Sequence, residues 1–463
     1  MACLRSANTF IWISLLALGC DSSSSTVRLR LSGLARTDAV TVSRSLHDCD
    51  WSADEPVHAD SHGDVVLTVA NESVLSSFLI TTSSGGRGTA TVMTNPHTEV
   101  SATVELVSAG AELSWRAGPA IRHPRIGATA AAIGQTIYLF GGDGESTVEL
   151  LDTSNATPMW TESSFNVPGV FTAESIGTSI VLLGNAPIEF STAGPAEAPA
   201  GLSFSARSEF AAASVGTRVF WAGGKSSDAT LGDFVGFDSA SGAIAGLPAL
   251  PDRRSQMAMA IDAQRGVVYF AGGDAGPLFA TYSLAPPGTA IGRSDAAGDP
   301  GGTSRLHPAA LVGGDGALYL IGGRDGENIS ARATRYDPLT AIFSDIPDLP
   351  ATLDRFAALI GPDGPIYLIG GTEDGQSAES TVWSYGPHFA AHPNGSGDLV
   401  VEGEGFIASR RICIAVVAES FQIAATSNAH GQLSAVLGVV PQGTISATDD
   451  ESRFSAVLKD HQH

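Results

Sequence analysis

Cysteine is scarce in this 463-residue chain, which has only four, so a small scaffold held together by disulfides is excluded. Basic residues are also few, since 25 lysines and arginines stand against 48 acidic residues and give a net charge of −23. Such a chain repels phosphate backbones, so nucleic acid is not an expected partner. After the first twenty residues no apolar run is long enough for a membrane-spanning helix. The 43% of hydrophobic residues is enough to fill the cores of roughly two to four domains.

The N-terminus has the pattern of a secretion signal. An apolar run over residues 10–18 follows Arg5 and is too short for an ordinary transmembrane helix. It ends at Ala17-Leu18-Gly19-Cys20 before four serines, which resembles a bacterial lipobox. We therefore expect residues 1–19 to be a lipoprotein signal peptide and residues 20–26 to be a lipidated Cys20 with its serine-rich tether. The alternative is an ordinary signal peptide with an incidental cysteine.

This interpretation places the protein in the bacterial cell envelope, at the outer membrane or the periplasmic face, with the N-terminal lipid as its membrane attachment. Cys49 and Cys413 remain after processing and could pair in an oxidising compartment. Cys413, however, lies in the alternating stretch of residues 411–416, which predicts a buried strand. We expect a buried free thiol there and not a disulfide.

An apolar strand that ends in glycine recurs through the middle of the chain. The first glycines of the copies stand at positions 141, 184, 223, 272, 322 and 370, and all copies except the one at Gly184 have a second glycine. Each copy has sequence for several short strands, with hairpin turns such as Asp315-Gly316 and Asp363-Gly364. Repeated units of four short strands, none able to bury both faces alone, are typical of β-propeller blades.

These units resemble kelch repeats, whose marks are the double glycine, the aromatic residue before it and the spaced Tyr and Trp. The resemblance covers about residues 110–387 and implies a six-bladed β-propeller. The last unit has no obvious fourth strand, whereas Glu112-Leu113-Ser114-Trp115 precedes the first unit as a fourth strand would. We therefore predict that this N-terminal strand completes the sixth blade and closes the ring.

Alternating segments on both sides of the repeats predict two smaller β domains. Residues 27–109 suit an immunoglobulin-like sandwich of about seven short strands. Residues 388–397, which include Asn394-Gly395-Ser396-Gly397, are expected to be a linker, and residues 398–463 resemble bacterial Ig-like modules. The predicted fold class is therefore all-β, a six-bladed kelch-type β-propeller flanked by N-terminal and C-terminal β-sandwich (Ig-like) domains.

Charged residues at fixed places in the units predict a binding face. Five copies have an arginine ahead of the glycines, and the loops after the glycines are acidic. Both kinds of loop open on one face of a propeller, so we expect a mouth of mixed charge that binds an anionic sugar or an acidic peptide. The alternative is that the arginine belongs to the kelch pattern and only links blades. The candidate binding residues are Arg125, Arg207, Arg254, Arg305, Arg355, Asp143, Asp274, Arg324, Asp325 and Asp374.

The predicted order of the domains also suggests two kinds of enzyme. A sandwich, a propeller and a second sandwich also occur in galactose-oxidase-like enzymes, which need a cysteine-linked tyrosine and two histidine ligands for copper. The propeller region has no cysteine, and its histidines are His123 and His307, so a copper-radical oxidase is excluded. A carbohydrate-active enzyme similar to sialic-acid epimerases remains the alternative, although the sequence identifies no catalytic residues.

An acidic loop near Cys49 contains His47, His58 and His62, but its spacing matches no zinc motif, so no metal site is expected there. We also expect no cofactor. The predicted function is a non-catalytic platform that binds a protein or glycan ligand at the loop-bearing face of the propeller. A passive spacer without a ligand is the third alternative.

Overall fold

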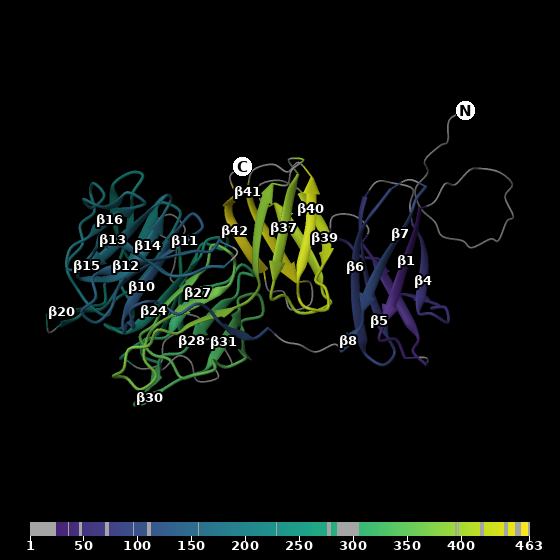
Figure 1. The fold of residues 1–463 in the computed structure, drawn as a ribbon. Coiled ribbons are helices and arrows are strands. Elements are labelled where there is room, and N and C mark those ends of the chain that lie inside the picture. Colours follow the sequence, from purple (N-terminus) through teal and green to yellow (C-terminus); the bar gives the residue numbers. More distant parts are fainter. Residues whose placement is uncertain are drawn as a thin grey trace.

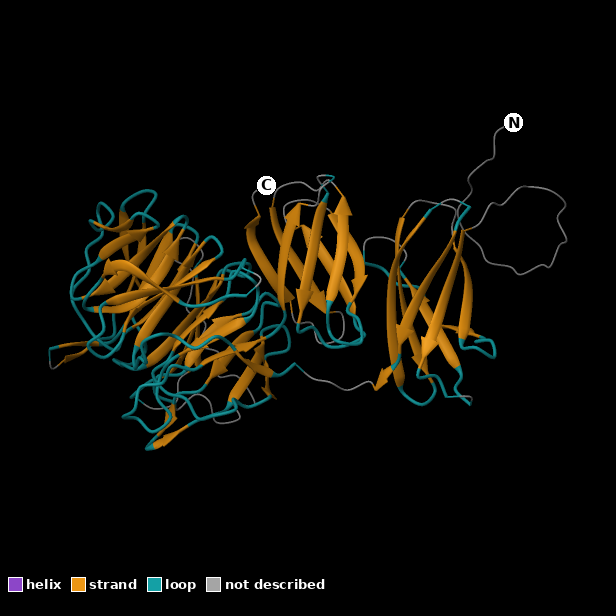
Figure 2. Cartoon of the chain, in the orientation of Figure 1, coloured by secondary structure: helices purple, strands orange, loops and turns teal. Residues whose placement is uncertain are grey.

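The computed structural model describes residues 25–461, apart from residues 36, 46–48, 70–73, 96, 109–112, 156, 228, 276–278, 285–304, 394–395, 397, 417–420, 439–442 and 450–454. Three β bodies lie in a row, with the propeller at one end, the C-terminal domain in the middle and the N-terminal domain at the other end (Figure 1). The described residues form strands and loops throughout (Figure 2). They include no helix that is long and apolar enough to span a bilayer. Cys20 and the predicted signal peptide lie outside the described residues.

The central repeats form six small antiparallel sheets arranged in a ring. Within a blade the strands pair in chain order, because short apolar strands joined by turns form hairpins; the exception is the outermost strand of the sixth blade, which comes from ahead of the first blade. The innermost strands of adjacent blades contact each other all the way round, including the last with the first. The all-β propeller predicted from the repeats is therefore confirmed.

The blades, each from its innermost strand outward, are as follows. The first has β10 (Ala128–Ile133), β11 (Thr136–Gly141), β12 (Thr147–Asp152) and β13 (Thr161–Asn166); the second has β14 (Val170–Ile176), β15 (Ser179–Gly184), β16 (Ile188–Ser191) and β17 (Gly194–Ala196). The third has β18 (Ala211–Val215), β19 (Arg218–Ala222), β22 (Phe234–Asp238) and β23 (Ala243–Leu247); the described part of the fourth has β24 (Met257–Asp262), β25 (Val267–Gly272) and β26 (Phe279–Ser283). The fifth has β27 (Ala309–Val312), β28 (Leu318–Ile321), β31 (Ala333–Asp337) and β32 (Ile342–Ile346); the sixth has β33 (Ala357–Ile360), β34 (Ile366–Ile369), β35 (Val382–Tyr385) and β9 (Trp115–Ala117). Two small hairpins, β20 (Lys225–Ser226) with β21 (Ala229–Thr230) and β29 (Arg324–Asp325) with β30 (Asn328–Ile329), extend from the third and fifth blades.

The ring is closed by the strand that precedes the first blade. β9 pairs antiparallel with β35, so that Trp115 lies opposite Tyr385. The Trp115 side chain is buried, its ring centroid is 5.0 Å from that of Tyr385, and its Nε1 donates a hydrogen bond to the carbonyl of Pro347 at 2.8 Å. The predicted closure of the sixth blade by an N-terminal strand is therefore confirmed.

The N-terminal domain consists of two packed sheets with a common apolar core that includes Leu29, Phe78 and Ile80. One sheet has the order β4-β1-β7, in which β1 and β7 are parallel, and the other has the order β3-β2-β5-β6-β8. The strands are β1 (Ser25–Ser32), β2 (Val40–Arg44), β3 (Glu55–Val57), β4 (Asp64–Val69), β5 (Val74–Thr82), β6 (Gly86–Thr94), β7 (Glu99–Glu105) and β8 (Val107–Ser108).

The C-terminal domain also has two sheets, β36-β37-β40 and β39-β38-β41-β42. Its strands are β36 (His388–Pro393), β37 (Leu399–Glu404), β38 (Arg411–Val416), β39 (Phe421–Thr426), β40 (Leu433–Gly438), β41 (Gly443–Asp449) and β42 (Ser455–His461). The linker expected at residues 388–397 is therefore mostly a strand, because only two residues separate β36 from the propeller's last strand in the chain, and β36 pairs along its length with β37.

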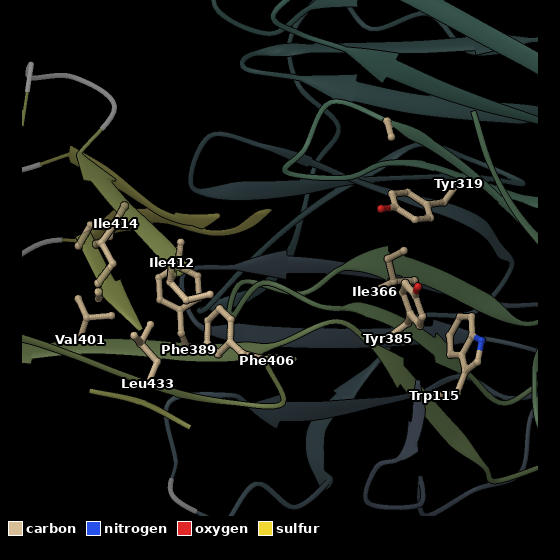
Figure 3. Close-up of a cluster of buried hydrophobic side chains, with 14 of the residues drawn as sticks. Trp115, Tyr319, Ile366, Tyr385, Phe389, Val401, Phe406, Ile412, Ile414 and Leu433 are labelled. Atoms are coloured by element: carbon tan, nitrogen blue, oxygen red, sulfur yellow. The ribbon is translucent and has the colours of Figure 1, made fainter. Parts of the chain in front are cut away.

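The propeller and the C-terminal domain share one hydrophobic core. Trp115 and Tyr385 of the sixth blade belong to the same buried cluster as Phe389 and Phe406 of the C-terminal domain (Figure 3). Because this cluster is continuous, the C-terminal domain is fixed against the fifth and sixth blades and not joined to them by a flexible tether.

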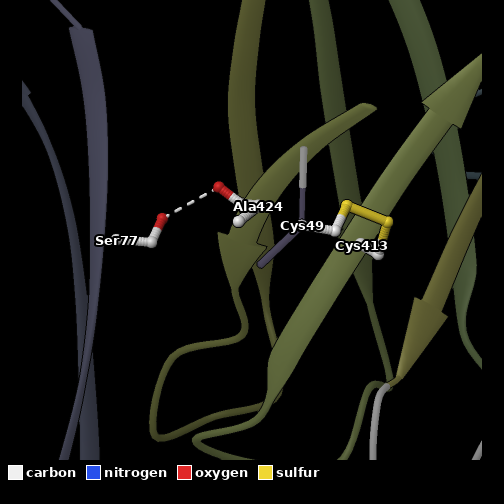
Figure 4. The surroundings of a disulfide bond; sticks show 4 residues. All are labelled: Cys49, Ser77, Cys413 and Ala424. Atoms are coloured by element: carbon white, nitrogen blue, oxygen red, sulfur yellow. Dashed lines mark hydrogen bonds between the residues drawn. A yellow bond between two sulfur atoms is a disulfide. The ribbon is translucent and has the colours of Figure 1, made fainter. Parts of the chain in front are cut away.

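A disulfide between Cys49 and Cys413 joins the N-terminal and C-terminal domains (Figure 4). The expectation of a free thiol at Cys413 is therefore wrong. Alternation along β38 does bury Ile412 and Ile414, but Cys413 has the opposite phase and points away from that core, toward the N-terminal domain. Beside the disulfide, the Ser77 hydroxyl donates a hydrogen bond to the carbonyl of Ala424 at 3.1 Å.

Candidate functional site

Four of the recurrent arginines are structural groups of the blade interior. Their exposed fractions lie between 1% and 8%, and Nη1 of each donates a hydrogen bond to the carbonyl of the first glycine in its own unit. Each arginine therefore ties the start of its blade to the end of the second strand and supplies a donor to a backbone carbonyl there. The pairs are Arg125 with Gly141 at 2.7 Å, Arg207 with Gly223 at 3.2 Å, Arg254 with Gly272 at 2.8 Å, and Arg305 with Gly322 at 3.2 Å.

These four guanidinium groups lie inside separate blades and do not converge on a common space. A ligand in solution does not reach side chains that are so deeply buried, and the Nη1 group of each already bonds to the backbone. The prediction that Arg125, Arg207, Arg254 and Arg305 contact a ligand is therefore corrected, and the alternative of a structural kelch arginine describes them.

Arg355 is not the sixth-blade counterpart of these arginines. Gly323 N donates to the carbonyl of Leu353 at 2.9 Å, as Gly224 N does to Arg254 and Gly273 N does to Arg305. Leu353 therefore occupies the position of the structural arginine. Arg355 lies two residues after Leu353, at the position that Glu209, Gln256 and His307 occupy in the other blades.

The residues at this later position form a ring around the propeller axis. Gly127, Glu209, Gln256, His307 and Arg355 come from five blades, and all have a positive φ, between 49° and 72°. Backbone hydrogen bonds join neighbours in the ring: Gln256 N donates to Glu209 O at 2.9 Å, His307 N to Gln256 O at 2.8 Å, and Gly127 N to Arg355 O at 2.7 Å. A left-handed backbone at four residues other than glycine is uncommon and is often found at functional sites. We call these five residues the axial ring.

A buried carboxylate organises the basic side of the axial ring. Asp354 is fully buried, and its oxygens lie 3.0 Å from Arg324 Nε, 3.4 Å from His307 Nδ1 and 3.7 Å from Arg355 Nε. Burial alone would raise the pKa of Asp354, but the contact with His307 and the charges of His307, Arg324 and Arg355 outweigh burial and hold the pKa below its ordinary value. The side chains of Arg324 and Arg355 are 27% and 32% exposed. Each therefore has an ion pair with the buried Asp354 and also a part that faces solvent.

An acidic group lies on the third and fourth blades. Glu209 Oε2 is 2.7 Å from Lys225 Nζ, and the hydroxyl of Ser255 lies 3.2 Å from Glu209 and 2.8 Å from Asp274. Burial opposes ionisation of Glu209, but hydrogen bonds with Lys225, Gln256 and Ser255 together lower its pKa. We refer to the axial ring together with Asp354, Arg324, Lys225, Ser255 and Asp274 as the mouth.

The remaining predicted acidic residues lie on the loops outside the mouth. Asp143 and Asp325 are exposed. Asp374 is also exposed, but its carboxylate accepts hydrogen bonds from Gln376 N at 2.7 Å and Ser377 N at 2.6 Å, and the hydroxyl and backbone of Ser377 strongly lower its pKa. Asp374 therefore stabilises its own loop.

Sequence reasoning missed seven members of the mouth: Gly127, Glu209, Lys225, Ser255, Gln256, His307 and Asp354. A signal for four of them was present, because Gly127, Glu209, Gln256 and His307 each stand two residues after a recurrent arginine. This position varies in charge and size between the five units, whereas four of the five keep the arginine and the sixth blade has Leu353 in its place, as expected where the scaffold is more constant than the recognition surface. Among the residues that the structure describes, no group of three His, Cys, Asp or Glu side chains is placed to hold a metal ion.

Six small sheets in a closed ring, four of them with a buried arginine bonded to the first glycine of the unit, define a six-bladed propeller with kelch-type units. A kelch motif family model matches residues 305–350, which cover the fifth blade, and the chain therefore carries a kelch-repeat β-propeller. A solved structure described as "Structure of YjhT" is similar over 61% of this chain and 99% of its own, with 12% sequence identity and a TM-score of 0.49. A comparison with curated proteins gives no match.

Proposed function

We propose that this chain is an exported binding protein of the bacterial cell envelope, and that the mouth recognises a carboxylate on an acidic glycan or an acidic protein segment. The observation that carries the proposal is the pair of Arg324 and Arg355, which extend from adjacent blades and are held by the buried Asp354. Guanidinium groups bind carboxylates through paired hydrogen bonds. Arg324 is ion-paired with Asp354, and Arg355 Nη2 donates a hydrogen bond to the carbonyl of Gly375 at 2.8 Å, so both side chains are already ordered and little conformational entropy is lost when a ligand binds.

The carboxylates of the mouth support binding and not catalysis. A general acid at neutral pH needs a raised pKa, whereas the pKa values of Glu209 and Asp354 are both lowered by their basic partners. Both groups are therefore ionised and serve to position Lys225, Arg324 and Arg355.

The Arg324→Ala/Arg355→Ala double variant should bind acidic ligands at least about tenfold more weakly than the wild type, because two charge-assisted contacts are lost. The measurement is titration calorimetry of the full chain with sialic-acid- and glucuronic-acid-terminated oligosaccharides and with an aspartate-rich peptide. Arg218→Ala is the matched control, since this exposed arginine begins the second strand of its blade, at the opposite end from the mouth. Equal affinity of the double variant and the wild type would show that the mouth is not the binding site. If NMR instead detects chemical conversion of a bound sugar, the carbohydrate-active alternative is favoured.

The export part of the proposal is supported by the Cys49–Cys413 disulfide, because such bonds persist in oxidising compartments. Expressed with its own leader in a bacterial host, the protein should fractionate with membranes and have a diacylglyceryl-modified Cys20 by mass spectrometry. Cys20→Ala should abolish both properties. A wild-type protein that keeps residues 1–19 and stays in the cytosolic fraction would contradict export.

A further inference from the structure

A cavity of about 790 Å³ lies where the propeller meets the two sandwiches, and residues of all three bodies line it. Its propeller wall includes a row of side chains across the sixth blade. Tyr367 of β34 lies opposite Ser384 of β35, which in turn lies opposite Arg116 of β9. Residues that lie directly opposite each other in a sheet have their side chains on the same face. All three residues line the cavity, so this row borders it.

The fifth blade shows what the equivalent row does when it only stabilises the sheet. The Tyr319 hydroxyl donates a hydrogen bond to Oδ2 of Asp315 at 3.1 Å. Arg335, which lies opposite Tyr319, donates to the same oxygen from Nη2 at 2.8 Å. A guanidinium group keeps its proton in proteins, so this ion pair holds the blade together but cannot transfer a proton.

The sixth blade replaces this arginine by two residues. The Tyr367 hydroxyl donates to Oδ2 of Asp363 at 2.7 Å, but Ser384 stands where the fifth blade has Arg335. The charged partner of Asp363 comes from the C-terminal domain, since Nδ1 of His388 lies 2.6 Å from Oδ2. Nε2 of His388 lies 3.4 Å from the hydroxyl oxygen of Ser384. A carboxylate, an imidazole and a hydroxyl are therefore linked in series.

The order of the three groups sets the direction in which a proton can move. An ionised carboxylate only accepts hydrogen bonds, so Nδ1 of the neutral imidazole carries the hydrogen and Nε2 is the acceptor that faces Ser384. In this arrangement a histidine can take the proton of a serine, while a buried aspartate orients the ring and stabilises the imidazolium. The Asp363 side chain is 8% exposed, which suits that role. In free enzymes the contact between serine and histidine is often long and shortens when a substrate binds.

The backbone fixes the imidazole against the carboxylate. Phe389, the residue after His388, donates a hydrogen bond from its backbone N–H to the carbonyl of Asp363 at 3.0 Å. The Phe389 side chain belongs to the hydrophobic core that the propeller shares with the C-terminal domain. The start of β36 is therefore held against the turn that contains Asp363, and all three groups lie on or beside strands, which position reacting groups more precisely than mobile loops do.

We infer that Ser384, His388 and Asp363 form a Ser-His-Asp triad that hydrolyses a small carboxylic ester in this cavity. Ser384 Oγ attacks the ester carbonyl carbon while its proton passes to Nε2 of His388. Arg116, beside Ser384 in the row, supplies positive charge for the oxyanion. The tetrahedral intermediate then collapses, the ester C–O bond breaks, and His388 gives its proton to the departing alkoxide. A water molecule, deprotonated by His388, hydrolyses the acyl-serine, so that ester and water yield acid and alcohol.

The walls of the cavity indicate the class of ester. The volume is within the usual range for small-molecule sites, which often lie between domains. Ser384 as a whole is only 3% exposed, so the acyl group that reaches its hydroxyl has to be small, as an acetyl group is. Glu402 and Glu404 line another wall and repel an anionic substrate. The substrate is therefore a short-chain ester without negative charge, unlike the acidic ligand proposed for the mouth.

The test uses the full chain with p-nitrophenyl acetate as the ester and with a fluorophosphonate probe that labels activated serines. The wild type should hydrolyse the ester, and mass spectrometry of its peptides should find the label on Ser384. Ser384→Ala should lose the label and lower kcat at least about a hundredfold. Ser434→Ala removes a hydroxyl from the opposite wall of the same cavity and should keep both properties, so it is the matched control.

Two further variants separate catalysis from a structural role. His388→Gly should lose hydrolysis, and added imidazole should restore part of it, since the free base can take the place of the missing side chain. Asp363 positions His388, so Asp363→Asn should lower kcat at least about a hundredfold and leave KM unchanged. Asp315→Asn, in the same row of the fifth blade, should hydrolyse the ester as the wild type does.

The inference is overturned if the wild type neither hydrolyses the ester nor takes the label, or if the label lies on another residue. It is also overturned if Ser384→Ala hydrolyses like the wild type, or if imidazole does not restore activity to folded His388→Gly. The Arg324→Ala/Arg355→Ala variant should hydrolyse normally. Asp363 lies in the hairpin between the first and second strands of its blade, whereas the mouth lies at the far end of the second strands, so each activity can fail without the other.

Discussion

Replacing Arg125 by alanine should lower the free energy of unfolding by about 3–5 kcal/mol, as for other buried ion pairs that lose one partner. Arg125 and Glu149 both have fully buried side chains, and Arg125 Nη2 donates to Glu149 Oε1 at 3.0 Å. Arg125 Nη1 also donates to the carbonyls of Gly141 at 2.7 Å and Thr147 at 2.9 Å. The alanine variant therefore leaves a buried carboxylate without its counter-charge and two buried carbonyls without this donor. Urea denaturation followed by tryptophan fluorescence measures the effect.

An exposed arginine provides the control for this prediction. Arg332 lies 3.1 Å from Asp345, and the two side chains are 34% and 64% exposed. Arg332→Ala should cost less than about 1 kcal/mol, because solvent screens exposed pairs. In addition, Arg125→Ala/Glu149→Ala should lose less than the sum of the single variants, because the second change removes the uncompensated charge. A loss below about 1 kcal/mol for Arg125→Ala would contradict its structural assignment.

The same arginines show where sequence reasoning succeeds and where it fails. The ring and its closure were predictable because each blade repeats an apolar strand and a glycine turn, and because the unit containing Trp383 lacked a fourth strand that the Trp115 segment could supply. The repetition that reveals a scaffold does not distinguish a scaffold residue from a recognition residue. The arginine recurs because in four blades it donates to a glycine carbonyl, whereas most of the mouth is built from positions that differ between copies.

Other features depend on contacts between distant segments. Cys49 and Cys413 are 364 residues apart, and their pairing requires the two sandwiches to lie side by side, which no local pattern indicates. The cavity between the three bodies likewise forms only where they meet, so no local pattern in the sequence predicts it.

Glu174 should make the stability of the propeller depend on pH. This residue lies on β14, the innermost strand of the second blade, and the adjacent innermost strands are rich in alanine. Burial raises the pKa of Glu174 from its ordinary value of 4.5 to about 7, and hydrogen bonds with Ser214 and Thr172 offset this only in part. The folded protein therefore favours the protonated carboxyl. The stability that this preference contributes is complete below about pH 4.5 and is lost as the pH rises through about 7.

Glu174→Gln mimics the protonated form at every pH and should remove this dependence. At pH 8 the variant should be more stable than the wild type by about 2–3 kcal/mol, since each unit of pKa shift corresponds to about 1.4 kcal/mol and the group is not wholly shielded from water. At pH 4.5 the two proteins should have nearly equal free energies of unfolding. Ser175→Ala, which removes an uncharged hydroxyl from the next position of the same strand, should keep the wild-type slope. The difference between the wild type and the Gln variant must grow with pH, so a difference that is constant from pH 4.5 to 8 would show that folding does not raise the pKa of Glu174.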